Sequence, residues 1–203
     1  MFKVERNMPP WGHCVQIGDP VLREIADEVP KELIKSPEIQ YLIKQMKVVL
    51  KDYRLVGIAA PQIGISLRII LMFCGEHLKD VITPETFKAR EMSTFPLTVF
   101  INPELEVVDH RKIIIEETCA SVVGFVAEVP RNYSVKVKAF DRNGKEFQHT
   151  FTGWNARIVQ HEIDHLNGIL FTDLMNRKSF RCTNWEIVNR KAGRIVIPFY
   201  PKK

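Results

Sequence analysis

The sequence predicts a single-domain α+β protein in which mixed or antiparallel β-sheets surround a central helix. Three observations support this fold class. The chain has 203 residues, a length that suits one compact domain. Hydrophobic residues make up 45% of it and charged residues 26%, which is the balance of an ordinary globular protein. Helical periodicity occurs early and late in the chain with β-type runs between, an order typical of α+β domains.

The first regular element expected is an amphipathic helix over residues 37–54. Residues 1–15 form an irregular segment before it, because prolines there oppose regular structure. Within 37–54, apolar residues recur at steps of three and four, and lysines occupy the opposite face. A loop follows at 55–66. The apolar run at 67–73 then predicts a buried strand.

The middle of the chain is predicted to consist mainly of β-strands. After a polar stretch at 75–95, four short runs are rich in Val, Ile, Phe and Thr. They cover residues 97–103, 105–117, 133–141 and 145–152. An Asn-Gly pair at 143–144, between the last two runs, predicts a hairpin turn.

The last part of the chain is predicted to hold a second helix over residues 155–167, with Gly168 as its C-terminal stop. Residues 179–203 form a C-terminal extension with a short strand-like run at 194–199. The net charge of +5 is mildly concentrated here. A solvated surface is the plain interpretation, and weak attraction to ribosomal RNA is the alternative. Without repeats or linkers, residues 1–203 are expected to form one domain.

Composition and hydropathy argue against several classes of protein. No apolar run approaches the about 20 residues of a membrane-spanning helix, and the N-terminus lacks an apolar signal core. Neither a membrane nor DNA is expected among the partners. The cysteines are widely spaced and form no CxxC motif, which argues against a disulfide framework and a structural zinc finger. They are Cys14, Cys74, Cys119 and Cys182.

The strongest chemical signal is QHEIDHLNG at residues 160–168. On a helix, His161 and His165 share one face with Cβ atoms about 5–6 Å apart, so both imidazoles can reach one divalent ion. Glu162 can then reach a metal-bound water without binding the metal, as in HExxH enzymes. We interpret Glu162 as a general acid/base beside a metal site. The alternative is a helix with two coincidentally spaced histidines and a surface glutamate.

Two histidines leave such a site short of ligands, because a catalytic metal usually has three protein ligands. The position that supplies a third histidine in HExxHxxGxxH enzymes is Phe171 here. Cys119, in EETCASVVGF, follows a β-type run and precedes small residues, as suits a ligand at a strand edge. Taken alone, a buried packing thiol is the plainer interpretation of Cys119.

Three segments, taken together and in order, resemble the peptide deformylase family. That family carries a loop GxGxAAPQ, a segment EGCxS and a helix with HExDH. The matching stretches are residues 56–62, 117–121 and 161–165. The resemblance extends over about residues 15–178 and includes INPEL and VPR around the cysteine segment. GDPVLR and SVVGFVAEVPR look most like the eukaryotic mitochondrial branch.

The resemblance implies a hydrolase that removes the N-terminal formyl group from formyl-methionyl nascent peptides. It implies Glu162 as the general acid/base. The side-chain amide of Gln62 and the backbone N–H of Ala120 would hold the formyl oxygen as charge develops on it. Gly57 would let the backbone approach the substrate closely. The implied metal ligands are Cys119, His161 and His165.

The resemblance also implies a cofactor, a location and partners. The cofactor would be one divalent ion, Fe²⁺ in cells, with Zn²⁺, Co²⁺ or Ni²⁺ as alternatives, because thiolate and imidazole ligands do not choose among them. An apolar pocket would take the methionine side chain, with Val123, Phe125 and Ile158 as candidates. The location would be mitochondrial, with the cytoplasm as the alternative because no clear transit peptide is seen. Related enzymes suggest a homodimer, and the ribosome surface is a further candidate partner.

Two departures from the family pattern affect the expected activity. Leu55 replaces the first glycine of the loop motif, and Thr118 replaces the glycine before the cysteine. If Thr118 takes a positive φ, strain of about 1–3 kcal/mol would reduce turnover. Thr118→Gly would then raise kcat/KM and leave metal content unchanged. Two alternatives stay open: a weakly active or non-catalytic paralogue with a structural metal, and an HExxH metallopeptidase that cleaves internal bonds.

Overall fold

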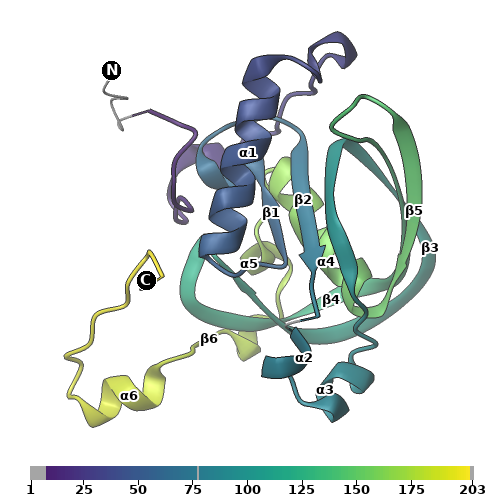
Figure 1. Cartoon of the computed structure of the whole chain (residues 1–203). Helices are drawn as coiled ribbons and strands as arrows, with labels where there is room; N and C mark the ends of the chain where they lie inside the picture. Colours follow the sequence, from purple (N-terminus) through teal and green to yellow (C-terminus); the bar gives the residue numbers. More distant parts are fainter. Residues whose placement is uncertain (1–7, 77, 202–203) are drawn as a thin grey trace.

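The structure is a computed structural model that describes residues 8–76 and 78–201 (Figure 1). Within them, five strands follow the order β1-β2-β3-β4-β5, and β6 pairs with β4. All paired strands are antiparallel. The strands are β1 Gly57–Ala59, β2 Ile69–Cys74, β3 Phe95–Cys119, β4 Val122–Phe140, β5 Glu146–Thr152 and β6 Arg181–Cys182. The predicted α+β class with antiparallel sheet structure is confirmed.

Both predicted long helices are present, and none of their ends differs from the prediction by more than two residues. Ser36 begins the first, because its side chain accepts a hydrogen bond from the Ile39 N–H at 3.3 Å. Gly168, with φ of 69°, follows the second. The α-helices are α1 Pro37–Asp52, α2 Leu78–Val81, α3 Pro84–Ala89, α4 Gly153–Leu166, α5 Phe171–Leu174 and α6 Trp185–Arg190. The 3-10 helices are Pro20–Arg23, Lys31–Leu33, Ala60–Ile63 and Arg177–Ser179.

The two β-type runs predicted at 97–103 and 105–117 belong to the single long strand β3. Its register against β4 shifts at several places, including between Ile101 and Glu104. The predicted break between the two runs is therefore an irregularity within one continuous strand. The hairpin turn at Asn143–Gly144 is confirmed, and Gly144 has φ of 75°.

Other segments differ from the prediction. The expected loop at 55–66 contains β1 and a 3-10 helix, and the polar stretch at 75–95 contains α2 and α3. Residues 194–199 form no strand. A strand requires a neighbour for its backbone groups, and in this stretch Val196 is 91% exposed. Helix α6, just before it, was not predicted.

The sheet separates two apolar layers and so places α4 at the centre. In β2, Ile69 and Leu71 pack with α1, whereas Ile70 and Met72 pack with α4. Burial on both faces explains why this strand is a continuous apolar run. Figure 1 shows α4 in the middle of the molecule, with β3 and β4 curving around it.

The ends of the chain are only partly described. Residues 8–15 lie in neither helix nor strand, and residues 1–7 and 202–203 lie outside the described residues. The predicted bounds of the irregular N-terminal segment and the C-terminal extension stay predictions. Within the described part of the chain, no helix is long and apolar enough to cross a membrane.

Candidate metal centre

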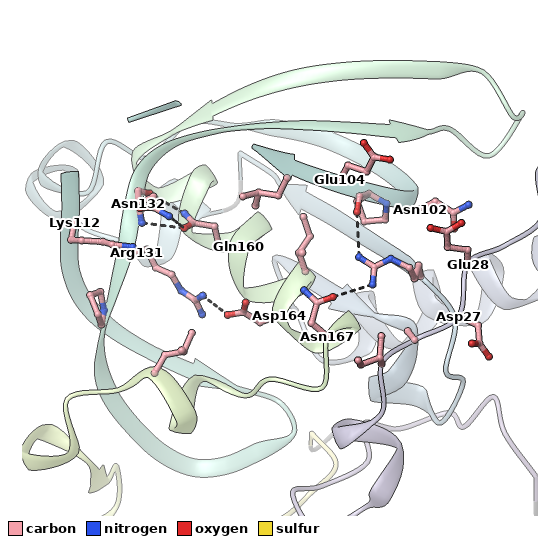
Figure 2. Close-up of a pocket in the computed structure, with 18 residues that line it drawn as sticks. Asp27, Glu28, Asn102, Glu104, Lys112, Arg131, Asn132, Gln160, Asp164 and Asn167 are labelled. Carbon is pink, nitrogen blue, oxygen red and sulfur yellow. Dashed lines mark hydrogen bonds and ion pairs between the residues drawn. The ribbon is translucent and has the colours of Figure 1, made fainter. Parts of the chain in front are cut away.

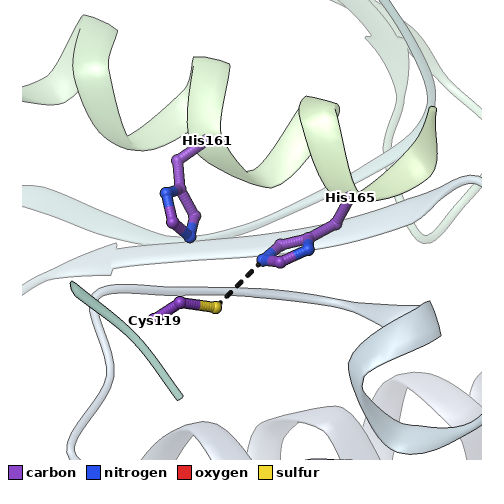
Figure 3. A group of neighbouring side chains, drawn as sticks. All are labelled: Cys119, His161 and His165. Carbon is purple, nitrogen blue, oxygen red and sulfur yellow. Dashed lines mark hydrogen bonds between the residues drawn. The ribbon is translucent and has the colours of Figure 1, made fainter. Parts of the chain in front are cut away.

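Three side chains from two elements converge at the centre of the molecule. Helix α4 contributes His161 and His165, one turn apart, and the last residue of β3 contributes Cys119 (Figure 3). Their ligand atoms all lie within 4.8 Å of one another. The Cys119 sulfur is 3.4 Å from Nε2 of His165. The third ligand that two histidines require is therefore Cys119, and its thiol does not serve only for packing.

The Cys119 sulfur is surrounded by hydrogen-bond donors. The Ser121 N–H donates to it at 3.3 Å, and Nε2 of Gln62 lies 3.6 Å away. These two groups hold the sulfur in place beside His165. A thiolate is the form of cysteine that binds a metal.

Glu117 fixes the orientation of the first histidine. It accepts from Nδ1 of His161 at 3.0 Å, so the ring turns its Nε2 toward the site. Arg131 donates to Glu117 through Nε at 2.9 Å and Nη2 at 3.0 Å, and Arg157 donates through Nη1 at 2.6 Å. Arg131, the arginine of the VPR segment, is therefore an ion-pair partner of Glu117. Arg131 also contacts Asp164 of α4.

The two histidine ligands differ in their pKa shifts. Burial alone would lower the pKa of His161, but its contacts with Cys119 and Glu117 raise it well above the usual value. Burial holds the pKa of His165 well below its usual value, so the ring is neutral and a ring nitrogen has a lone pair for a metal ion. One thiolate and two imidazoles form a donor set suited to a divalent transition metal.

Glu162 lies beside the ligands with one oxygen unused. It is buried, and its Oε2 has no hydrogen-bond partner among the described residues. A Cβ built on Gly57 would lie 2.4 Å from Oε1 of Glu162. Glycine at this position therefore makes room for the carboxylate, a reason that the sequence did not reveal. Burial raises the pKa of Glu162 to about 7.

Gln62 is held so that its amide N–H₂ group faces the site. The Ala59 N–H donates to Oε1 of Gln62 at 2.9 Å, which fixes the amide orientation. Nε2 then points toward Cys119 and toward Oγ of Ser121 at 3.3 Å. A buried donor is thus preorganised next to the metal ligands.

A cavity of about 450 Å³ opens onto these groups. Its lining includes Gly57, Gln62, Thr118, Cys119, Ala120, His161 and Glu162. Its apolar lining includes Leu55, Val56, Val126, Trp154 and Ile158. Of the three residues predicted to contact a methionine side chain, only Ile158 lines it. Phe125 instead stacks on Phe180 with ring centroids 5.1 Å apart, and Val123 is not among the lining residues.

A larger cavity of about 840 Å³ lies on another face of α4 (Figure 2). None of the three metal ligands lines it. Several of its polar groups satisfy one another: Gln160 pairs with Asn132, and Arg68 donates to Asn167 at 3.0 Å. The chemistry of the metal ligands therefore belongs to the smaller cavity.

Comparison with known proteins agrees with this geometry. Residues 12–181 match the family model described as polypeptide deformylase. The human mitochondrial peptide deformylase is 41% identical over 181 residues, which cover 89% of this chain and 74% of the human protein. The tomato chloroplastic peptide deformylase 1A is 44% identical over 180 residues, which cover 88% of this chain and 64% of that protein.

Solved structures show the same likeness. A Met-Ala-Ser-bound class I type b peptide deformylase from Acinetobacter baumannii superposes with a TM-score of 0.71 at 33% identity, over 80% of this chain and 96% of that chain. A Synechococcus elongatus peptide deformylase in complex with actinonin has a TM-score of 0.69 at 29% identity, over 96% of this chain and 93% of that chain. The chain belongs to the peptide deformylase family. It is a hydrolase that removes the N-terminal formyl group from nascent peptides, and Cys119, His161 and His165 form its metal site.

The two departures from the deformylase pattern are accommodated without the expected strain. Thr118 lies within β3, is exposed, and is not among the residues with positive φ. Extended backbone suits a β-branched residue, so the condition on which the rate gain of Thr118→Gly depended is not met. In the other segment, Arg54, which directly precedes Leu55, has a positive φ of 54°. Leu55 packs against the core cluster of α1 and lines the cavity.

Sequence reasoning missed part of this deformylase site. Arg157 stands four residues before His161, so it lies one turn away on the same face of α4. Glu117 stands two residues before Cys119, on the same side of β3. These spacings place each residue on the same side of its element as a metal ligand, but they do not indicate that Arg157 and Glu117 pair with each other. Trp154 in the cavity lining carried no such signal.

Proposed function

We propose that the 450 Å³ cavity binds the formyl-methionyl end of a nascent peptide and that Glu162 is the general acid/base of its hydrolysis. The observation that carries this proposal is the buried Glu162 carboxylate, which is next to the metal ligand His161 in the chain and whose Oε2 has no hydrogen-bond partner within residues 8–76 and 78–201. A buried acceptor without a partner is costly unless it serves a ligand or a reaction.

The reaction adds water to the formyl carbon and breaks the C–N bond, which yields formate and a free α-amine. When bound, the divalent ion supplies Lewis-acid polarisation and a lowered pKa of water. Glu162 accepts the proton of the attacking water and returns it to the leaving nitrogen. Gly57 leaves the room that this carboxylate needs against β1.

The formyl oxygen gains negative charge as water attacks. Two donors are proposed to stabilise it: Nε2 of Gln62 and the backbone N–H of Ala120. The Gln62 amide cannot flip without losing the bond from the Ala59 N–H. Removal of one such donor typically costs about 3–4 kcal/mol of transition-state stabilisation.

The methionine side chain is proposed to occupy the apolar part of the cavity, formed by Leu55, Val56, Trp154 and Ile158. A related deformylase from Acinetobacter baumannii has been solved with Met-Ala-Ser bound, which supports a peptide product of this kind. Cavities lined mainly by apolar side chains with a few placed polar groups are typical of such sites.

Fe²⁺ is the proposed ion in cells, with Zn²⁺, Co²⁺ or Ni²⁺ as substitutes that the same ligands accept. Metal analysis of protein purified without oxygen would decide among them. A mitochondrial location is proposed because the human relative is named mitochondrial, with the cytoplasm as the alternative. Imaging of the tagged protein tests this location. A homodimer and the ribosome surface are proposed as further interactions, tested by sedimentation with and without ribosomes.

The deciding experiment is a deformylation assay on Co²⁺-loaded protein with formyl-Met-Ala-Ser. We expect turnover by the wild type and a loss of at least about a thousandfold in Glu162→Gln with the metal retained. Cleavage of an unblocked peptide in the same assay would instead identify a metallopeptidase. Stoichiometric metal without turnover would identify a paralogue that keeps the metal for structure or binding.

A further inference from the structure

The N-terminal segment at residues 14–17 connects the two loops that carry the proposed oxyanion donors. The Val15 N–H donates to the Gln62 carbonyl at 2.9 Å. Two residues later, the Ile17 N–H donates to the Ser121 carbonyl at 2.7 Å. One short stretch therefore fixes the 3-10 helix of Gln62 and the turn of Ala120 relative to each other.

Gln16 lies between Val15 and Ile17 in the sequence, and its side chain forms hydrogen bonds to the turn itself. Its Nε2 donates to the Ala120 carbonyl at 2.8 Å and to the Cys14 carbonyl at 3.1 Å. Its Oε1 accepts from the Val123 N–H at 3.3 Å. The amide thus bonds to backbone groups on both sides of Ser121, from the turn residue Ala120 to the beginning of β4.

This turn has a backbone that needs support from outside. Cys119 pairs with Val122, so Ala120 and Ser121 form a two-residue connection between β3 and β4. Two-residue hairpins favour turn types with positive φ, which match the twist of the strands. Neither Ala120 nor Ser121 is among the residues with positive φ. The bonds from Gln16 and Ile17 hold a turn geometry that the hairpin alone does not favour.

We propose that Gln16 is a positioning residue for deformylation. Its hydrogen bonds fix the turn and thereby orient the backbone N–H of Ala120 toward the formyl oxygen. This inference rests on the proposed role of that N–H. Cys119 is fixed on one side of Ala120 by metal binding, and Gln16 fixes the carbonyl on the other side. The Gln16 amide donates to the Ala120 carbonyl and accepts from the Val123 N–H, a combination that a carboxylate or a thioether cannot supply.

The test compares Gln16→Glu and Gln16→Met with the wild type. Gln16→Glu keeps the acceptor for Val123 but places a carboxylate against the Ala120 carbonyl, and Gln16→Met removes every bond at similar volume. Gln148→Glu is the matched control, because Gln148 on β5 is exposed and its side chain forms no hydrogen bond within the described part of the chain. All proteins are loaded with Co²⁺ and assayed on formyl-Met-Ala-Ser.

We expect kcat to fall about tenfold in both Gln16 variants, while KM and Co²⁺ affinity stay within about twofold, because the Ala120 N–H acts mainly on the charge that develops in the transition state. Gln148→Glu should match the wild type. A Gln16 residue that only supported the fold would lower thermal stability and metal affinity without this selective loss of kcat.

The outcomes separate this inference from the proposed function. An inactive wild type would refute the proposed function. An active wild type with unchanged kcat in both Gln16 variants would overturn the inference alone. A parallel loss of Co²⁺ affinity would also overturn it, because Gln16 would then support Cys119 rather than Ala120. If both variants lose their native circular dichroism, Gln16 is a folding residue and the inference is again wrong.

Discussion

A methyl group on Gly57 would lie 2.4 Å from Oε1 and 2.7 Å from Cδ of Glu162. At the scale of single residues, this close approach links β1 to the carboxylate that is proposed as the acid/base. Because β1 is buried and paired with β2, the backbone cannot retreat easily, and Glu162 must move instead. We predict that Gly57→Ala lowers kcat by about a hundredfold, in line with the contribution of a positioned general base.

Metal content should be unchanged in Gly57→Ala, because the metal ligands lie outside this contact. Gly12→Ala is the control: a Cβ at Gly12 would meet nothing within 4 Å, so its kcat should equal that of the wild type. The measurement is kcat on formyl-Met-Ala-Ser together with Co²⁺ stoichiometry. A Gly57→Ala enzyme with full activity would show that Glu162 does not need its present position.

The metal ligands were predictable at this scale, whereas their partners were not. The four-residue spacing of His161 and His165 indicates one helix face without any knowledge of the fold. Cys119 could be assigned only by resemblance, because its approach to the histidines depends on where β3 ends. The bonds of Glu117 to Arg131 and Arg157 join residues 14 and 40 positions apart, and no local pattern specifies such pairs.

At the scale of elements, Arg157 ties α4 to both long strands. It donates to Glu117, to the Val129 carbonyl at 2.9 Å and to the Ile113 carbonyl at 2.5 Å. Removal of one partner from a buried ion pair typically costs about 3–5 kcal/mol. We predict that Arg157→Met lowers the free energy of unfolding by this order and weakens Co²⁺ binding by about tenfold to a hundredfold, because Glu117 orients His161.

Arg181→Met is the control for this prediction. Arg181 pairs with Glu116, the neighbour of Glu117, at 2.7 Å, but both side chains are nearly half exposed. Solvent screens such a pair, so neither stability nor Co²⁺ affinity should change measurably. The measurements are denaturant unfolding and competition with a chelator. Equal effects of the two variants would show that the burial of the ion pairs of Glu117 adds nothing to stability or to Co²⁺ affinity.

The predictions of helices and strands succeeded where an apolar pattern marks a buried face. They failed where the structure depends on pairing with another strand. Helix α1 was predicted within two residues because its apolar stripe packs on the sheet. Residues 194–199 have the composition of a strand but find no partner strand, so they stay irregular. The continuity of β3 through its register shifts depends on β4 across from it, which a single segment does not reveal.

At the scale of the whole molecule, the metal joins elements that are far apart in the sequence. Cys119 ends β3 and the two histidines lie in α4, so the ligand set exists only in the folded chain. An ion that binds the native state alone stabilises it in proportion to the logarithm of its concentration over the dissociation constant. We predict that chelation of the metal lowers the free energy of unfolding by about 3–4 kcal/mol, as expected for an ion at 100 to 1,000 times its dissociation constant.

The measurement is thermal unfolding of Co²⁺-loaded protein before and after addition of a chelator. Cys119→Ala serves as the control, because it removes one ligand and leaves the fold around α4 otherwise intact. Its melting temperature should be lower at the outset and should respond little to the chelator. If the chelator leaves the wild-type melting temperature unchanged, the buried charges of His161, Glu117 and Arg131 hold the site together without an ion. The stability of the molecule would then be independent of the metal that its activity needs.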